Sequence, residues 1–327
     1  MAERVAVIGA ALWTKRLASV LANYGCMRCS PVSEIRARDC WNLLWLPGAR
    51  YLLRVGFRPG QFRPRGLVID LVSALYVGFG GKMVFYWTGS DVQRTLSLYR
   101  QGESFSTRWG RAVSRFLMNR ARHCAAAPWL VDELDSIGVS AVCRPFPTPT
   151  EEFEPLIHTR DDQALPFRVL TYIPDHNFEN YCGSEMVEVA RLLPNVQFAV
   201  MGGSGSWCAE PPANIKFLGW TNAAEQYVQA AVVVRAVRHD ALGGTVREAL
   251  LCGCHVIYTF PHEHTEQLEL LDCVEDTARH LAGMIADLEK RFSVGELPSN
   301  GQGRQWVMDH LGEEKLSADL VGYLRDR

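Results

Sequence analysis

The sequence contains no apolar run that approaches the roughly 18 residues needed to cross a bilayer. It passes directly into an apolar segment at residues 5–8, without the basic and hydrophobic regions of a signal peptide. Its ten cysteines are scattered, and Cys26-x-x-Cys29 has no second pair at zinc-site spacing. We therefore expect a cytoplasmic protein with reduced thiols and no metal site. Nothing in the sequence indicates an obligate protein partner.

Lysine is rare in the first half, where arginine supplies nearly all the positive charge. Residues 1–150 carry 20 Lys and Arg, 18 of them Arg, against 9 acids, whereas residues 151–327 carry 14 against 27. This asymmetry is hidden in a net charge of −2. It indicates that the first half meets an anionic partner, although a solvated basic surface is the alternative.

Two domains of ordinary size fit in 327 residues. Strand and helix patterns alternate in both halves, with first-half strands expected at 5–8, 41–46 and 82–87. The proline-rich, acidic segment at 145–152 reads as an extended connector. The predicted domain layout is 1–148, a linker at 149–165, a second domain at 166–303, and terminal helices at 304–327.

The most informative stretch surrounds Gly243 and Gly244. An apolar strand runs toward these glycines, and a helix pattern and a second apolar strand follow them. In such a βαβ unit, the turn directs backbone N–H groups and the positive end of a helix dipole at one point, which suits a diphosphate. Asp240 and Glu248 bracket the turn.

These residues also permit an interpretation without a ligand. Thr245-x-x-Glu248 matches a capping box, in which the glutamate folds back on the helix N-terminus. Asp240 has the residue type of an ordinary turn.

The segment from Asp240 to Ile257 resembles the donor-site signature of retaining glycosyltransferases of the two-domain B-type fold, as in family four. It has an acid and a Glu separated by seven residues, then Ala-Leu, and a Gly before a Val-Ile strand. The family usually has Glu where Asp240 stands. The resemblance implies an α/β chain with two doubly wound, Rossmann-like domains that face a central cleft. It implies that Glu248 holds the ribose of a UDP- or GDP-sugar, that Asp240 lies by the sugar, and that the turn binds the diphosphate. Thr245 follows the turn, and His239 could donate to sugar or phosphate, although a structural role is its alternative.

The resemblance extends over residues 166–258, where LPNVQFAVMGGSG and NIKFLGW keep the family's order. It places Gly203 at the donor and the nucleotide base near Leu218, Gly219 and Trp220. It also implies that the last helix of the chain packs back on the first domain.

One loop departs from the family pattern. The family places an Arg and a Lys after the first strand of this domain, but residues 173–180 contain neither. Arg238 is our preferred replacement as the group that neutralises the diphosphate, with Arg247, His176 or a first-domain arginine as alternatives.

In the first domain, Trp87-Thr88-Gly89-Ser90-Asp91-Val92 is similar to a stretch that lines the family's cleft. Asp91 is thus a catalytic candidate and Ser90 an acceptor contact, with a helix N-cap as the alternative. Gly9 and Ala10 occupy the first loop, which in the family faces the same cleft.

Further arginines are candidates for contacts with an anionic acceptor. The segment at 50–65 mixes Arg58 and Arg63 with aromatic residues. Arg108, Arg111 and Arg115 fall on one stripe of a helix pattern. Both groups could bind phosphates at a membrane surface or on nucleic acid, or simply face solvent.

The resemblance implies transfer of a sugar to an acceptor hydroxyl with retention, with no metal ion or cofactor, and with the leaving phosphate accepting the acceptor proton. We expect a polyprenyl-phosphate-linked or polysaccharide precursor as acceptor, which would place the protein at the inner membrane surface. Hydroxymethylated bases in DNA are an alternative acceptor. A non-catalytic module that binds nucleotide-sugars is a third hypothesis.

Overall fold

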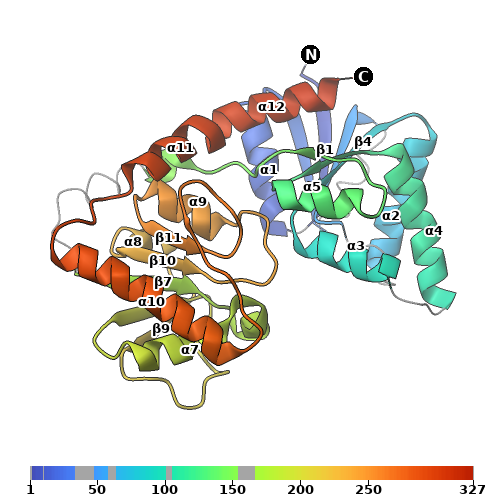
Figure 1. The fold of residues 1–327 in the computed structure, drawn as a ribbon. Helices are drawn as coiled ribbons and strands as arrows, with labels where there is room; N and C mark the ends of the chain where they lie inside the picture. The colour runs from blue at the N-terminus through green and yellow to red at the C-terminus, as the bar shows by residue number, and fades with distance from the viewer. Residues whose placement is uncertain are drawn as a thin grey trace. The chain divides into compact units, whose positions relative to one another are not determined.

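The chain divides into two compact units in a computed structural model (Figure 1). Unit 1 comprises Met1–Pro147 and Glu313–Arg327, and unit 2 comprises Thr148–Gly312. No helix of the described residues is long and apolar enough to cross a membrane. The structure describes residues 2–9, 11–33, 48–57, 64–100, 105–153 and 166–326.

Among the described residues, unit 1 contains a six-stranded parallel sheet in the order β2-β1-β3-β4-β5-β6. Most of its strands are apolar along their length because helices cover both faces of such a sheet. The strands are β1 (Arg4–Gly9), β2 (Arg28–Ser33), β3 (Tyr51–Val55), β4 (Lys82–Trp87), β5 (Arg122–Ala125) and β6 (Val142–Cys143). The helices are α1 (Ala11–Asn23), α2 (Pro64–Gly78), α3 (Ser90–Arg100), α4 (Phe105–Arg120), α5 (Pro128–Asp135) and α12 (Glu313–Arg325). The strand expected at 41–46 lies outside the described residues.

Unit 2 contains a second six-stranded parallel sheet, in the order β12-β11-β10-β7-β8-β9. A core that includes Val189, Phe198, Val234 and Ile285 joins this sheet to its helices. The strands are β7 (Arg168–Tyr172), β8 (Gln197–Met201), β9 (Ile215–Gly219), β10 (Val232–Arg235), β11 (His255–Tyr258) and β12 (Glu266–Gln267). The helices are η2 (Asp175–Tyr181), α7 (Gly183–Leu192), α8 (Ala223–Tyr227), α9 (Gly244–Leu251), α10 (Val274–Ser293) and α11 (Gly301–Leu311).

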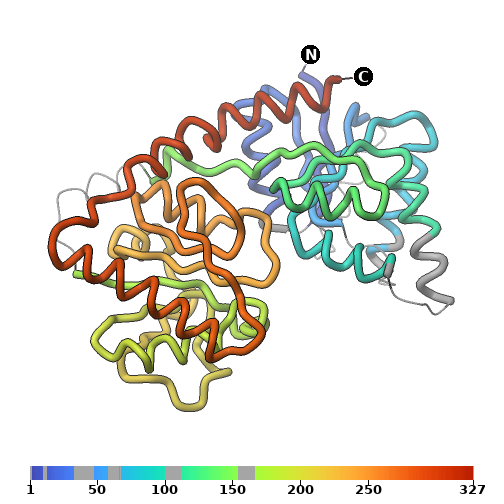
Figure 2. The backbone as a smooth tube through the Cα atoms, in the orientation of Figure 1, coloured from blue at the N-terminus to red at the C-terminus, as the bar shows by residue number. Residues whose placement is uncertain are grey.

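The two C-terminal helices belong to different units. Helix α11 begins at Gly301 and lies on α9, where a side chain on Gly303 would meet Leu250 at 2.8 Å, so it belongs to unit 2 rather than to a tail beginning at 304. Helix α12 returns to unit 1, where Tyr323 donates to the His123 carbonyl at 2.8 Å. The two ends of the chain consequently lie together (Figure 2).

Candidate functional site

The double glycine forms the start of α9. Gly243 is the N-cap and the helix begins at Gly244, so Thr245 lies inside the helix and the capping box given above as the alternative does not form. The Thr245 hydroxyl instead bonds to the phenol of buried Tyr227. Leu242 has φ of +52°, a left-handed conformation that costs a non-glycine residue energy and that clusters at functional sites. Because the first N–H groups of a helix have no intrahelical partner, this turn can receive an anion.

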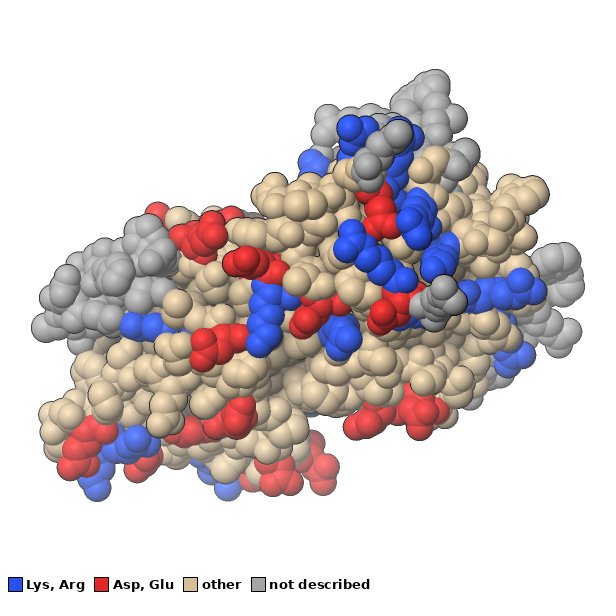
Figure 3. All heavy atoms as spheres, turned by 90° about the horizontal axis from the view of Figure 1, so that it is seen from above, with Lys and Arg blue, Asp and Glu red and all other residues tan. Residues whose placement is uncertain are grey.

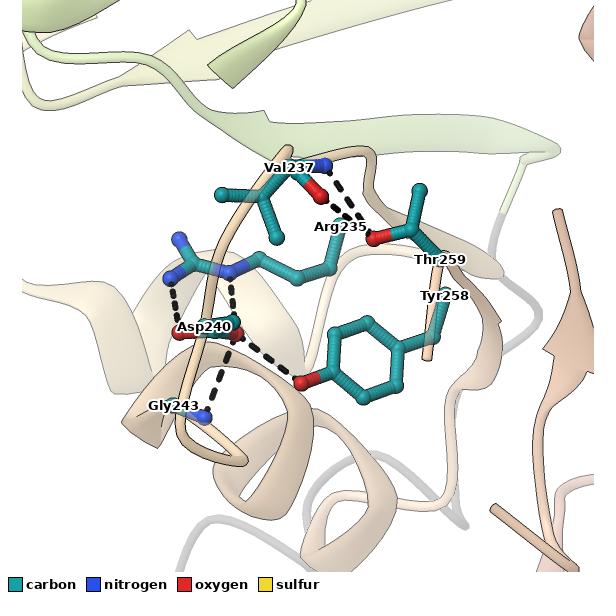
Figure 4. A network of polar contacts seen from close by, with 6 residues as sticks. All are labelled: Arg235, Val237, Asp240, Gly243, Tyr258 and Thr259. Carbon is teal, nitrogen blue, oxygen red and sulfur yellow. Dashed lines mark hydrogen bonds and ion pairs between the residues drawn. The ribbon is translucent and has the colours of Figure 1, made fainter. Parts of the chain in front are cut away.

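Asp240 is held by a buried network at the base of the turn (Figure 4). Arg235, the last residue of β10, donates from Nε and Nη2 to its two oxygens at 3.0 and 2.9 Å. Tyr258, the last residue of β11, donates its hydroxyl to Asp240 Oδ2 at 3.1 Å. The Gly243 N–H lies 3.3 Å from the same oxygen. The network therefore fixes the turn to the ends of two neighbouring strands.

The two charges of this network stabilise each other. Burial alone would lower the pKa of the Arg235 guanidinium, but the Asp240 carboxylate raises it above its ordinary value. Burial would raise the pKa of Asp240, yet Arg235 holds it below its usual range. Asp240 is only 8% exposed, so the structure gives it a positioning role in the loop. Contact between Asp240 and a transferred sugar stays a prediction.

Aromatic side chains continue from this network across the carboxyl ends of the strands. Tyr181 lies against the Arg235 guanidinium at 4.7 Å, and Tyr172 contacts Tyr181 edge to face at 5.5 Å. Trp220, which is largely exposed, lies 6.1 Å from Tyr172. Sequence reasoning missed Tyr172, Tyr181 and Arg235. The available signal was position, since parallel sheets hold ligands at strand carboxyl ends and both Tyr172 and Arg235 are final strand residues.

The loops that follow β7, β8 and β9 are tied together. Asp175 accepts the N–H groups of Ser204 and Gly205 at 2.8 and 2.9 Å, and the Ser204 N–H lowers the pKa of Asp175. A side chain on Gly203 would collide with the Asp175 carboxylate. Gly219 donates to the Gly203 carbonyl at 3.1 Å. The structure thus brings Gly203 next to Gly219, which adjoins Leu218 and Trp220. Contact of Leu218, Gly219 and Trp220 with a nucleotide base stays a prediction.

The arginine that lies beside the turn is Arg235, not the predicted Arg238. Arg238 pairs with Glu185 at 2.6 Å and donates to the Glu179 carbonyl. Arg247 is buried and donates to Thr148 at 3.1 Å. The guanidinium that the structure places beside the turn is Arg235, since a side chain on Gly243 would lie 3.0 Å from its Nη2 atom.

Two histidine candidates lie in the loops on this side of unit 2. His176 is exposed in η2, and His239 is partly exposed beside Asp240. Within the described residues, no group of three His, Cys, Asp or Glu side chains could hold a metal ion.

The site residues Asp91, Ser90 and Gly9, predicted in unit 1, lie at the start of a helix or at the end of a strand. The Asp91 carboxylate, 2% exposed, accepts the Thr88 and Val92 N–H groups at 2.9 and 3.1 Å in the first turn of α3. Asp91 therefore lies inside the first turn of α3, which begins at Ser90, and is not the N-cap given above as the alternative. A catalytic role for Asp91 stays a prediction. Ser90 begins α3 and is exposed. Gly9 lies at the end of β1 against β3.

Several predicted acceptor contacts lie outside the described residues, namely Ala10, Arg58, Arg63 and the side chains of Arg108 and Arg111. Arg115 is exposed on α4, with its guanidinium 5.4 Å from the Tyr99 ring.

We expect Asp91 to make stability depend on pH. Burial raises the pKa of Asp91 from 3.8 to about 6. Between these two pH values the folded chain keeps a proton on Asp91 that the unfolded chain has lost. The stability of the folded chain therefore falls as pH rises from about 4 through 6. Relative to Asp91→Asn, which has no such proton, the wild type should lose up to about 3 kcal/mol of unfolding free energy between pH 4 and 7. Urea denaturation of both proteins across this range measures the difference, in which other groups cancel. A difference that does not change with pH would contradict the assignment.

No protein-family model and no protein of curated function matches the sequence. Solved structures do match its fold over nearly the whole chain. Sucrose-phosphate synthase from Thermosynechococcus elongatus superposes with a TM-score of 0.68 and 13% identity, covering 99% of this chain and 98% of its own. HepE from Anabaena, in complex with UDP and glucose, gives a TM-score of 0.68 at 10% identity with full coverage of both chains.

WaaG, a glycosyltransferase of lipopolysaccharide biosynthesis, gives a TM-score of 0.60 at 12% identity, covering 99% of this chain and 100% of its own. These identities are too low to carry more than the fold. The α/β architecture with two doubly wound parallel sheets is confirmed. The chain therefore has the B-type glycosyltransferase fold that its donor-site motif predicted.

Proposed function

We propose that this chain transfers a sugar from a UDP-sugar to an acceptor hydroxyl, with retention and without a metal ion. The observation that carries the proposal is the Gly243-Gly244 turn at the start of α9, at the carboxyl end of a parallel sheet. Glu248 lies over it, with Oε1 3.1 Å from where a side chain on Gly244 would begin. Several structures of the same fold contain UDP, which favours uridine over guanosine.

The proposed roles follow from the charge that develops during transfer. The leaving diphosphate becomes more negative, and the N-terminus of α9 stabilises this charge with backbone N–H groups that are already oriented. Arg235 supports it in place of the Arg and Lys that the loop at 173–180 lacks, and Asp240 holds Arg235 in position. Glu248 binds the ribose hydroxyls, and the leaving phosphate accepts the acceptor proton.

Glu248→Ala is expected to weaken UDP binding by about tenfold to a hundredfold, because it removes hydrogen bonds to a charged group. Titration calorimetry and thermal shift with UDP, GDP and UDP-glucose measure this effect. Glu188→Ala is the matched control, since Glu188 is another partly exposed glutamate on a unit 2 helix and should leave binding unchanged. Equal UDP binding by wild type and Glu248→Ala would show that the donor site is misplaced.

We propose a polyprenyl-phosphate-linked or polysaccharide precursor as the acceptor, rather than a hydroxymethylated base in DNA. UDP release should then require the lipid-linked acceptor, and the anomeric proton of the product reports retention. The buried position of Asp240 favours one competing function, a module that binds the nucleotide-sugar without transferring it. Tight UDP-sugar binding without UDP release on any of these acceptors would support that function.

A further inference from the structure

Helix α2 of unit 1 exposes an apolar stripe. Val68 and Leu71 are each 50% exposed, Leu75 is 60% exposed, and Phe79, just beyond the helix, is 88% exposed. At about 100° per residue, these four positions fall within one narrow face of the helix. A contiguous exposed apolar surface of this kind marks an interaction site more often than single exposed residues do.

The polar side chains of the same segment are directed away from this stripe. Asp70 pairs with buried Arg54 at 2.5 Å, and Ser73 is fully buried. The Tyr76 hydroxyl donates to the Ala49 carbonyl at 3.3 Å. The exposed face of α2 is therefore built of hydrocarbon.

Helix α4 lies beside α2 and contributes positive charge (Figure 1). Residues 105–122 contain five arginines and no acid. Phe116 is 40% exposed on α4, with the Arg120 guanidinium 5.5 Å from its ring. Arg115, next to Phe116, is exposed. This helix thus places Arg120 against a second exposed aromatic side chain and Arg115 against Tyr99.

The amino edge of the unit 1 sheet extends the positive surface. Basic residues stand at or next to the start of five neighbouring strands, and Lys82 follows Phe79 by three positions. Figure 3 shows Lys and Arg gathered on this side of unit 1, with some acidic side chains among them. Arg50 pairs with Glu3 at 2.6 Å. These strand-start residues are Arg28, Arg4, Arg50, Lys82 and Arg122.

We propose that the α2–α4 face, made of the α2 stripe with Phe116, Arg115 and Arg120, docks on an anionic phospholipid bilayer. Entry of hydrocarbon side chains into the boundary of the acyl chains lowers the free energy of binding, and so does contact of arginines with anionic headgroups. A nucleic acid would bind the arginines but leave the aliphatic stripe in water, so the bilayer accounts for both features. The inference concerns unit 1 and stands apart from donor binding in unit 2.

Flotation of the full-length chain with vesicles tests this proposal. The wild type should bind vesicles containing phosphatidylglycerol and not those of phosphatidylcholine alone, and added salt should weaken binding. The double variant Leu75→Gln/Phe79→Gln, and separately Arg115→Gln/Arg120→Gln, should each lower the partition coefficient about tenfold or more. Thermal unfolding of each variant verifies that it is folded.

Matched controls come from exposed residues of unit 2. Leu192→Gln/Val294→Gln removes exposed apolar side chains, and Arg191→Gln/Arg279→Gln removes exposed arginines, without touching the α2–α4 face. Both controls should float as the wild type does. Unchanged UDP binding by the unit 1 variants would separate docking from the donor site.

Three results would overturn the proposal. One is absence of binding to anionic vesicles by the wild type. Another is DNA binding that Arg115→Gln/Arg120→Gln abolishes and Leu75→Gln/Phe79→Gln leaves intact, with no vesicle binding. The third is self-association without lipid that Leu75→Gln/Phe79→Gln abolishes, which would identify a second copy of the chain as the occupant of this face.

Discussion

Replacement of Asp240 by alanine is expected to destabilise unit 2 by about 3–5 kcal/mol, because it leaves the buried Arg235 cation without its counter-ion. Arg235 makes two hydrogen bonds to Asp240, and the Tyr258 hydroxyl loses its acceptor in the same variant. Denaturant unfolding of the wild type and of Asp240→Ala, followed by circular dichroism, measures the change.

The double variant Arg235→Met/Asp240→Leu provides the control for Asp240→Ala. Both charges are then replaced by apolar groups of similar size, so most of the lost stability should return, as is common when a complete buried ion pair is exchanged. Sugar transfer should remain weak in the double variant, because the turn has lost its nearby cation. If Asp240→Ala kept wild-type stability and lost only transfer, Asp240 would be a sugar contact rather than a positioning residue.

Gly9→Ala is expected to destabilise unit 1 by about 3 kcal/mol or more, through strain and backbone displacement. Gly9 has φ of +153° and pairs in register with Val55 of β3. A methyl group built there would collide with the Val55 carbonyl oxygen, so β1 and β3 would have to separate. Chemical denaturation monitored by circular dichroism detects the loss.

Gly322→Ala is the matched control for Gly9→Ala. Gly322 lies in α12 of the same unit, and an added side chain there meets nothing within 4 Å. Alanine should therefore stabilise this helix by up to about 1 kcal/mol. A Gly9→Ala protein as stable as wild type would instead favour the acceptor-loop interpretation, in which glycine serves a ligand rather than the strand pairing.

The βαβ unit around α9 could be predicted from sequence because its signals are local. Apolar strands, two glycines and a stop at Gly253 lie within one short segment, and the observed elements follow the same order. The partners of Asp240 could not be predicted in the same way. Tyr258 comes from the next strand, and its contact with Asp240 depends on the register of β10 against β11.

The excess of arginine in the first half does not indicate which individual arginines are exposed and which are buried. Arg54 lies in the arginine-rich segment at 50–65, which is expected either to bind phosphates or to face solvent, yet it is buried in β3 and pairs with Asp70. A charged residue in an apolar strand looks exposed until its partner is known, and Asp70 comes from another element, α2. The role of the Asp175 carboxylate was missed for the same reason, since the N–H groups that it accepts lie in the loop after β8.

The return of α12 to unit 1 has a consequence for synthesis on the ribosome. Unit 2 is one uninterrupted stretch, whereas unit 1 needs Leu316, Leu320 and Leu324 to complete its core. Domains generally fold as units during translation. The later-made unit can therefore finish folding first, while the earlier-made one waits for α12 to emerge.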